Sequence, residues 1–180
     1  GNSLSANQLM FLNIGDNALS GGIRAALVGG AYIDSSIAVN DGQPHHIAYT
    51  FDGVDTYKLY IDGVSQGSTS GSAPALSSAD LFIGQHFQGT VQLDGVMGDF
   101  RIYSDERSAT EVASDALGQT TGDNLQIHYD FDATNVVGGA VVNQGALGAS
   151  ADATLGATST AEASDPTLTD IVDPTVPMAV

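Results

Sequence analysis

The chain has 180 residues, and its 21 acidic and 4 basic side chains give a formal net charge of −17. So few cations exclude a nucleic-acid partner and an anionic membrane surface, because both are bound through clusters of Lys and Arg. The sequence holds no Cys and no apolar run long enough for a membrane span. Disulfides, thiolate metal sites and membrane insertion are therefore not expected.

Short strands are predicted through the first third of the chain, each an apolar or alternating run between turn residues. They cover 8–14, 23–28, 31–38, 45–51 and 57–61. In the last two runs, strict alternation places the apolar residues on one face: Ile47, Tyr49 and Phe51, then Tyr57, Leu59 and Ile61. Asp-Gly pairs at 52–53 and 62–63 follow these runs, where a turn needs a left-handed residue. This pattern is typical of a sandwich or barrel.

Three more strands are predicted at 81–83, 96–103 and 125–131. One helix is predicted after Ser108, because Glu111 three residues later completes a capping box and Gly118 stands where a helix commonly ends. Val112, Ala116 and Leu117 give this helix a short apolar stripe. Residues 156–180 are Ala, Ser, Thr, Asp and Pro without periodicity, which predicts an extended tail or linker.

The acidic residues are 18 Asp and only 3 Glu, at positions 106, 111 and 162. Short Asp side chains suit turns and calcium-binding loops, whereas Glu is typical of solvated helix faces. A large negative charge destabilises a compact chain by self-repulsion, and bound Ca²⁺ would offset it. The composition therefore predicts an extracellular all-β protein, secreted or on a bacterial cell surface, with Ca²⁺ as its cofactor.

Five segments together resemble the laminin-G-like, concanavalin A-like jelly-roll family. They are 41–53 (DGQPHHIAYTFDG), 57–63 (YKLYIDG), 81–84 (LFIG), 94–103 (DGVMGDFRIY) and 108–112 (SATEV). The resemblance implies a two-sheet antiparallel jelly-roll sandwich with one short helix, a fold of lectins, adhesins and glycan-acting enzymes. Pro44 stands where the family has a characteristic Trp, so an aromatic contact of the family is missing.

The order of the segments is unusual for that family. Residues 124–132 (NLQIHYDFD) and 141–148 (VVNQGALG) resemble the opening of such a domain, yet they follow its closing helix. Either a second module begins near 122, or one module has a permuted or split strand order. We favour one domain over 1–155, with the middle and closing part at 1–118, an opening-type hairpin at 122–155, and the tail at 156–180.

Catalysis is not expected. Glycosidases of this fold use carboxylates spaced as Glu-x-Asp-x-x-Glu, and that motif does not occur in the sequence. A lyase would pair His and Tyr with a cation that neutralises a uronate. The pairs His46–Tyr49 and His128–Tyr129 occur, but cations are almost lacking.

A calcium site has more support in the sequence. If 96–103 pairs with 125–132, alternation turns Phe100 and Ile102 inward and leaves Asp99, Asp130 and Asp132 on the outside. Three carboxylates with few cations nearby would repel one another unless neutralised. We predict that these three residues ligate a Ca²⁺ that holds the two strands together. The alternative is a cross-strand ion pair between Arg101 and Asp130.

Ligand contacts are expected from aromatic side chains, since sugars stack on exposed rings. The candidates are Tyr60, on the face opposite Leu59 and Ile61, together with His86 and Phe87 in a loop, and Tyr32. The first hypothesis is a non-catalytic, calcium-stabilised extracellular adhesin module that attaches to glycan or supports neighbouring adhesin domains. A calcium-dependent carbohydrate-binding lectin domain and a glycan-cleaving enzyme of the same fold are the alternatives.

Overall fold

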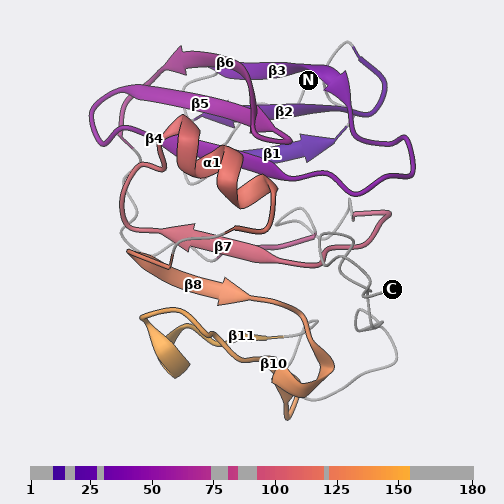
Figure 1. Cartoon of the computed structure of the whole chain (residues 1–180), viewed down its shortest axis with the longest axis vertical. Helices are drawn as coiled ribbons and strands as arrows, with labels where there is room; N and C mark the ends of the chain where they lie inside the picture. Colours follow the sequence, from indigo (N-terminus) through magenta and orange to yellow (C-terminus); the bar gives the residue numbers. More distant parts are fainter. Residues whose placement is uncertain are drawn as a thin grey trace. The chain divides into compact units, whose positions relative to one another are not determined.

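The computed structural model describes residues 10–14, 19–27, 31–73, 81–84, 93–119 and 122–154 (Figure 1). The chain forms two compact units. Gly1–Asp80 with Asp105–Thr121 make the first, and Leu81–Ser104 with Gly122–Val180 make the second. The chain thus passes from the first unit to the second twice. No helix among the described residues is both long and apolar enough to cross a membrane.

The first sheet of unit 1 is antiparallel, with the order β1-β2-β3. Its strands are β1 (Met10–Ile14), β2 (Gly22–Leu27) and β3 (Tyr32–Ala38), close to the predicted runs. The ladder between β2 and β3 is irregular next to Gly22. There the hydroxyl of Ser35 accepts the hydrogen bond of the Ile23 N–H at 2.8 Å, so this buried donor keeps a partner.

The second sheet of unit 1 has the order β4-β5-β6. Its strands are β4 (Ile47–Phe51), β5 (Thr56–Ile61) and β6 (Val64–Ser70). The register confirms the predicted shared face, since Ile47 lies opposite Ile61, Tyr49 opposite Leu59 and Phe51 opposite Tyr57. The predicted turn at 62–63 is also confirmed, with φ 51° at Asp62 and 76° at Gly63. Strand β6 was not predicted, because its sequence, VSQGSTS, has no alternating apolar residues.

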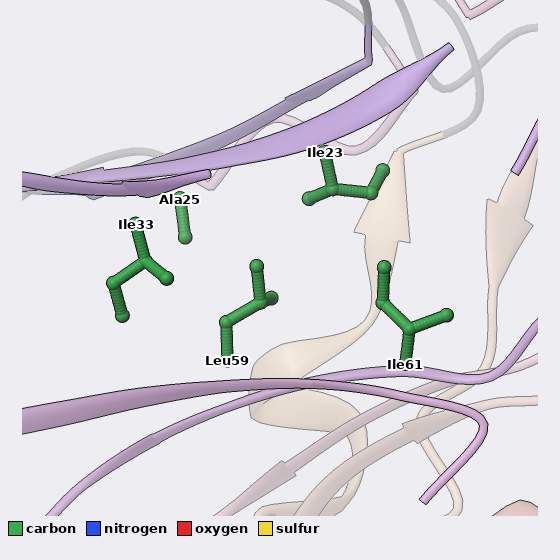
Figure 2. Close-up of a cluster of buried hydrophobic side chains, with 5 residues drawn as sticks. All are labelled: Ile23, Ala25, Ile33, Leu59 and Ile61. Atoms are coloured by element: carbon green, nitrogen blue, oxygen red, sulfur yellow. The ribbon is translucent and has the colours of Figure 1, made fainter. Parts of the chain in front are cut away.

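The core of unit 1 lies between these two sheets (Figure 2). The first sheet contributes Ile23, Ala25 and Ile33, and the second contributes Leu59 and Ile61, all nearly inaccessible to solvent. In Figure 2 the two sets of side chains point toward one another from opposite ribbons. The burial of alternate residues on both sheets confirms the two-layer β-sandwich expected from the sequence.

Helix α1 (Ala109–Ala116) belongs to the same unit and has the predicted capping box. The Glu111 N–H donates to the Ser108 hydroxyl, while the Glu111 carboxylate accepts from the Ser108 N–H. Gly118 follows the helix with φ 70°, as expected for a glycine just beyond the C-cap. Val112 is fully buried, but Leu117 is 67% exposed and is not part of the apolar stripe that was predicted.

Unit 2 is built on a two-stranded antiparallel ladder of β7 (Phe100–Tyr103) and β8 (Leu125–Tyr129). A second small sheet contains β9 (Val136–Val137), β10 (Ala140–Val141) and β11 (Ala153–Thr154). The buried amide of Asn143 joins the two parts, because its Oδ1 accepts from the His128 N–H and its Nδ2 donates to the Gln126 carbonyl.

Two of the predicted strands differ from the structure. Residues 81–84 form no strand, and both Leu81 and Phe82 are exposed, so this apolar run is not a buried edge of the sheet. The strand predicted at 96–103 begins only at Phe100. The predicted tail at 156–180 lies outside the described residues, and the assignment of 122–155 to the same sandwich stays a prediction.

Candidate functional site

The acidic residues Asp99, Asp130 and Asp132 lie at the end of the β7–β8 ladder. The two strands pair as the alternation required, with Phe100 opposite Tyr129 and Arg101 opposite His128. The rings of Phe100 and Tyr129 stack with their centroids 6.1 Å apart. The prediction that these distant segments are neighbours is therefore confirmed.

Asp99 is held by two basic side chains. Its Oδ2 accepts a hydrogen bond from Arg101 Nη2 at 2.9 Å and lies 3.1 Å from His128 Nε2 on the neighbouring strand. The ion pair that the structure shows for Arg101 is thus with Asp99, which immediately precedes its strand β7. The alternative considered from the sequence had paired Arg101 with Asp130 across the ladder.

Asp130 and Asp132 accept hydrogen bonds within the segment that follows β8. The side-chain amides of Gln144 and Asn135 donate to Asp130 Oδ2 at 2.5 and 2.9 Å. Burial alone would raise the pKa of Asp130, but these amides and the Asp132 N–H lower it below its usual value. Asp132 accepts from the Thr134 hydroxyl and N–H, which lower its pKa and cap the short 3-10 turn η1 (Ala133–Asn135).

The three carboxylates are not gathered into one cluster. Among the described ranges, no group of three or more His, Asp or Glu side chains is close enough to hold a metal ion. Ca²⁺ needs about six to eight oxygen ligands, so binding at Asp130 and Asp132 would require it to displace the donors that now occupy their oxygens. Calcium ligation by Asp99, Asp130 and Asp132 stays a prediction.

The predicted ligand contacts have different surroundings. Tyr60 is only 4% exposed, so its ring offers no face to a sugar in this structure. The segment before and within α1 lies on this side of β5, where Lys58 Nζ contacts Glu106 Oε1 at 2.7 Å.

His86 and Phe87 lie outside the described residues. Of the described residues that flank them in the sequence, Leu93 donates its N–H to the Gly84 carbonyl at 2.7 Å.

Tyr32, at the start of β3, is the candidate aromatic residue that the structure leaves open, with 52% of its surface exposed. The guanidinium carbon of Arg24 lies 4.0 Å from the centroid of its ring, a cation–π contact. Asp34 holds Arg24 through two hydrogen bonds of 2.7 Å. The three side chains therefore form a fixed polar and aromatic group on the outer face of β2 and β3.

A histidine between two carboxylates was not found from the sequence. His45 Nδ1 lies 2.8 Å from Asp62 Oδ2, and His45 Nε2 lies 3.0 Å from Asp41 Oδ1. The contact with Asp62 raises the pKa of His45 most, partial burial opposes it, and Asp41 adds to the increase. Both ring nitrogens can donate to carboxylates only when the ring is protonated. The spacing of Asp41 and His45 was visible in the sequence, but the approach of Asp62 depends on the β5–β6 turn.

Each of the four basic residues in the chain has an acidic partner. The pairs are Arg24–Asp34, Lys58–Glu106, Arg101–Asp99, and Arg107 with both Glu111 and Asp115. The two described Glu residues are therefore both engaged in ion pairs. This distribution leaves no cluster of unpaired cations for a polyanion.

A comparison with protein families matches residues 3–113 to the model of the concanavalin A-like lectin/glucanases superfamily. One similar solved structure is a 2.1 Å crystal structure of residues 221–444 of an S-layer domain-containing protein from Clostridium thermocellum, with 28% identity and a TM-score of 0.40. The likeness covers 54% of this chain and 52% of that one, so the chain spans about half the length of that structure. No curated protein matches the chain.

Proposed function

Because the chain belongs to the concanavalin A-like lectin/glucanase superfamily, we propose that it is a non-catalytic attachment module that works outside the cell, as part of an adhesin. It would hold a neutral glycan or support neighbouring adhesin domains at a cell surface.

The engagement of the carboxyl groups carries the non-catalytic part of this proposal. A glycosidase needs one carboxyl group with a raised pKa to protonate the leaving oxygen, opposite a second ionised carboxylate. Glu106 is paired with Lys58, and hydrogen bonds from Ser108 lower the pKa of Glu111.

Hydrogen bonds also lower the pKa of four aspartates. The N–H groups of Thr56 and Val54 lower the pKa of Asp52 to about 2, and the N–H of Gln43 lowers that of Asp41. The pKa values of Asp130 and Asp132 are also lowered. These four groups are suited to stay ionised and to fix loops, which is a structural role.

The pairing of all four cations supports a ligand without much negative charge. With a net charge of −17, the chain would repel a uronate, a sulfated glycan or an acidic protein surface. An exposed aromatic residue and hydrogen-bonding groups without net charge would then provide the attachment.

The experiment that tests this proposal combines binding to neutral glycans with turnover assays on the same glycans and on a uronate-containing glycan. We expect the purified chain to bind intact cells or a glycan array, while releasing no reducing ends or unsaturated uronate. Release of either product would overturn the non-catalytic assignment. A chain that bound neither cells nor glycans would overturn the attachment role and leave only the support of neighbouring adhesin domains.

Calcium can be tested separately by thermal melting with and without a chelator. If Ca²⁺ is bound in the folded state, its removal takes the free energy of binding away from the free energy of unfolding. The melting temperature then falls. A matched variant, Asp132→Asn, should then reduce the effect of the chelator. An unchanged melting temperature would remove calcium from the proposal without affecting the attachment role.

A further inference from the structure

We propose that the outer face of β2 and β3 is the saccharide contact, where the ring of Tyr32 packs on a sugar and Arg24 and Asp34 bind its hydroxyls. The inference rests on the proposed attachment function and names the surface and ligand class that would carry it. No comparison assigns these residues a role.

The position of Tyr32 makes its ring available. Its neighbour Ile33 is 5% exposed and belongs to the core, so alternation directs the Tyr32 side chain to the outer side of the sheet. Tyr32 lies opposite Ala26 in the register, and 52% of its own surface is exposed. Its exposed ring area would be buried on binding, which is the main source of aromatic binding energy.

Arg24 holds the ring in place before any ligand arrives. Its guanidinium group lies over the ring at 4.0 Å, and Nε and Nη2 donate to the two carboxylate oxygens of Asp34. Arg24 and Asp34 also face each other in the β2–β3 register, so the backbone supports the same geometry. A group that is already ordered loses little conformational entropy when a ligand binds.

The chemistry of the three side chains matches a neutral sugar. A pyranose ring has an apolar C–H surface for Tyr32 and hydroxyl groups that both donate and accept hydrogen bonds. Asp34 accepts and Arg24 donates, while their opposite charges neutralise each other locally. An acidic sugar would meet the carboxylate of Asp34 and the negative charge of the whole chain.

Affinity gel electrophoresis tests the proposal with soluble β-1,3-glucan, galactomannan and polygalacturonate as probes. We expect at least one neutral polysaccharide to retard the wild-type chain. Tyr32→Ala should weaken that binding about tenfold, which corresponds to ~1.4 kcal/mol. Tyr32→Phe keeps the ring and should bind within about threefold of wild type, a difference well below the ~1.4 kcal/mol of a tenfold change.

Two further variants make the result specific. Arg24→Gln removes the cation that orders the ring and should weaken binding with the ring still present. Val54→Ala removes a 72% exposed apolar side chain at the β4–β5 turn and should leave binding unchanged. Circular dichroism verifies that each variant is folded, and Arg24→Gln replaces Tyr32→Ala if the latter is not.

The outcomes separate this inference from the proposed function. Neutral polysaccharide binding that survives Tyr32→Ala and Arg24→Gln would overturn the site and leave the attachment role intact. Retardation by polygalacturonate alone would overturn the ligand class. Binding to cells without binding to any saccharide would overturn the inference in favour of a protein ligand. Failure to bind cells or saccharides would overturn both.

Discussion

The two sheets of unit 1 share one core, but their outer faces differ. On β5, Tyr60 is 4% exposed and Lys58 is paired with Glu106 from the segment that leads into α1. On β3, Tyr32 is 52% exposed beside Arg24 and Asp34. Alternation assigns both tyrosines to outer faces, so it cannot distinguish them. What separates them is a segment more than forty residues later in the chain that covers one sheet (Figure 1).

The largest effect is expected inside the covering segment, where a buried ion pair joins the residues before α1 to its last turn. Arg107 and Asp115 have side chains only 6% and 7% exposed and are joined by hydrogen bonds of 3.1 and 3.2 Å. Arg107→Ala leaves the Asp115 carboxylate buried without its cation, which should lower the free energy of unfolding by about 3–5 kcal/mol. Urea denaturation measures the loss.

The matched control for Arg107 is Arg101, whose ion pair with Asp99 is partly solvated, at 25% and 41% exposure. Arg101→Ala should cost no more than about 1 kcal/mol. Equal losses for the two variants would contradict the idea that a buried ion pair stabilises the covering segment.

A somewhat smaller effect is expected where the helix meets the β5–β6 turn. A Cβ added to Gly63 would lie 2.9 Å from the Cα of Ala113, and Gly63 has φ 76°. Gly63→Ala should therefore displace α1 from the sheet and cost about 2–4 kcal/mol, the sum of overpacking and left-handed strain. Differential scanning calorimetry gives the change, and the Tyr60 ring should become more accessible to nitration.

Gly53 provides a control with the same backbone strain and no neighbour. It has φ 82° and no atom within 4 Å of an added Cβ. Gly53→Ala should cost only the left-handed strain of about 1–2 kcal/mol. A loss as large as that of Gly63→Ala would show that α1 does not rest on the turn.

A pH-dependent effect is expected at the β5–β6 turn, where His45 contacts Asp62 of the turn and also Asp41. Folding raises the pKa of His45, so the folded chain binds this proton more tightly than the unfolded chain does. The resulting stability is complete below the ordinary pKa of about 6.5 and is lost as pH rises through the raised value. His45→Gln should lower the melting temperature more at about pH 5.5 than at about pH 9.

The carboxylates that face His45 define the control for that experiment. Asp62→Asn removes the strongest contact and should abolish most of the pH-dependent difference, because Asp62 makes the largest contribution to the raised pKa. If His45→Gln changed the melting temperature equally at both pH values, the histidine would not be protonated between its carboxylates.

The smallest effect on stability is expected on the open face, which is the outer face of β2 and β3. The ion pair of Arg24 with Asp34 is partly solvated, at 25% and 30% exposure, and Tyr32 beside it is 52% exposed. Arg24→Gln should lower the free energy of unfolding by about 1 kcal/mol or less, combining a surface ion pair and a cation–π contact. A loss of several kcal/mol in urea denaturation would mean that this face is structural, not open.

Much of the sandwich was predictable because period-two alternation and local turn chemistry determine it. The pairing of β4 with β5 follows from two apolar faces and the Asp-Gly turns, and the helix follows from Ser108 and Glu111. Strand β6 was not predictable, since its polar residues carry no alternation and its pairing is set by the turn before it.

The candidate sites were less predictable, because each depends on contacts between distant residues. Pairing of β7 with β8 brought Asp99 near His128 as expected, but the side-chain amides that bind Asp130 come from positions 135 and 144. Likewise, the outer position of Tyr32 follows from alternation, whereas its cation–π contact requires the register of β2 against β3.

The most direct test of the open face is an NMR titration of the 15N-labelled chain with an oligosaccharide of the neutral polysaccharide that retards it. The account predicts that amide shift changes concentrate at Arg24, Tyr32 and Asp34 and leave 57–61 and 109–116 unchanged. Changes confined to the α1-covered sheet or to the β7–β8 ladder would contradict it.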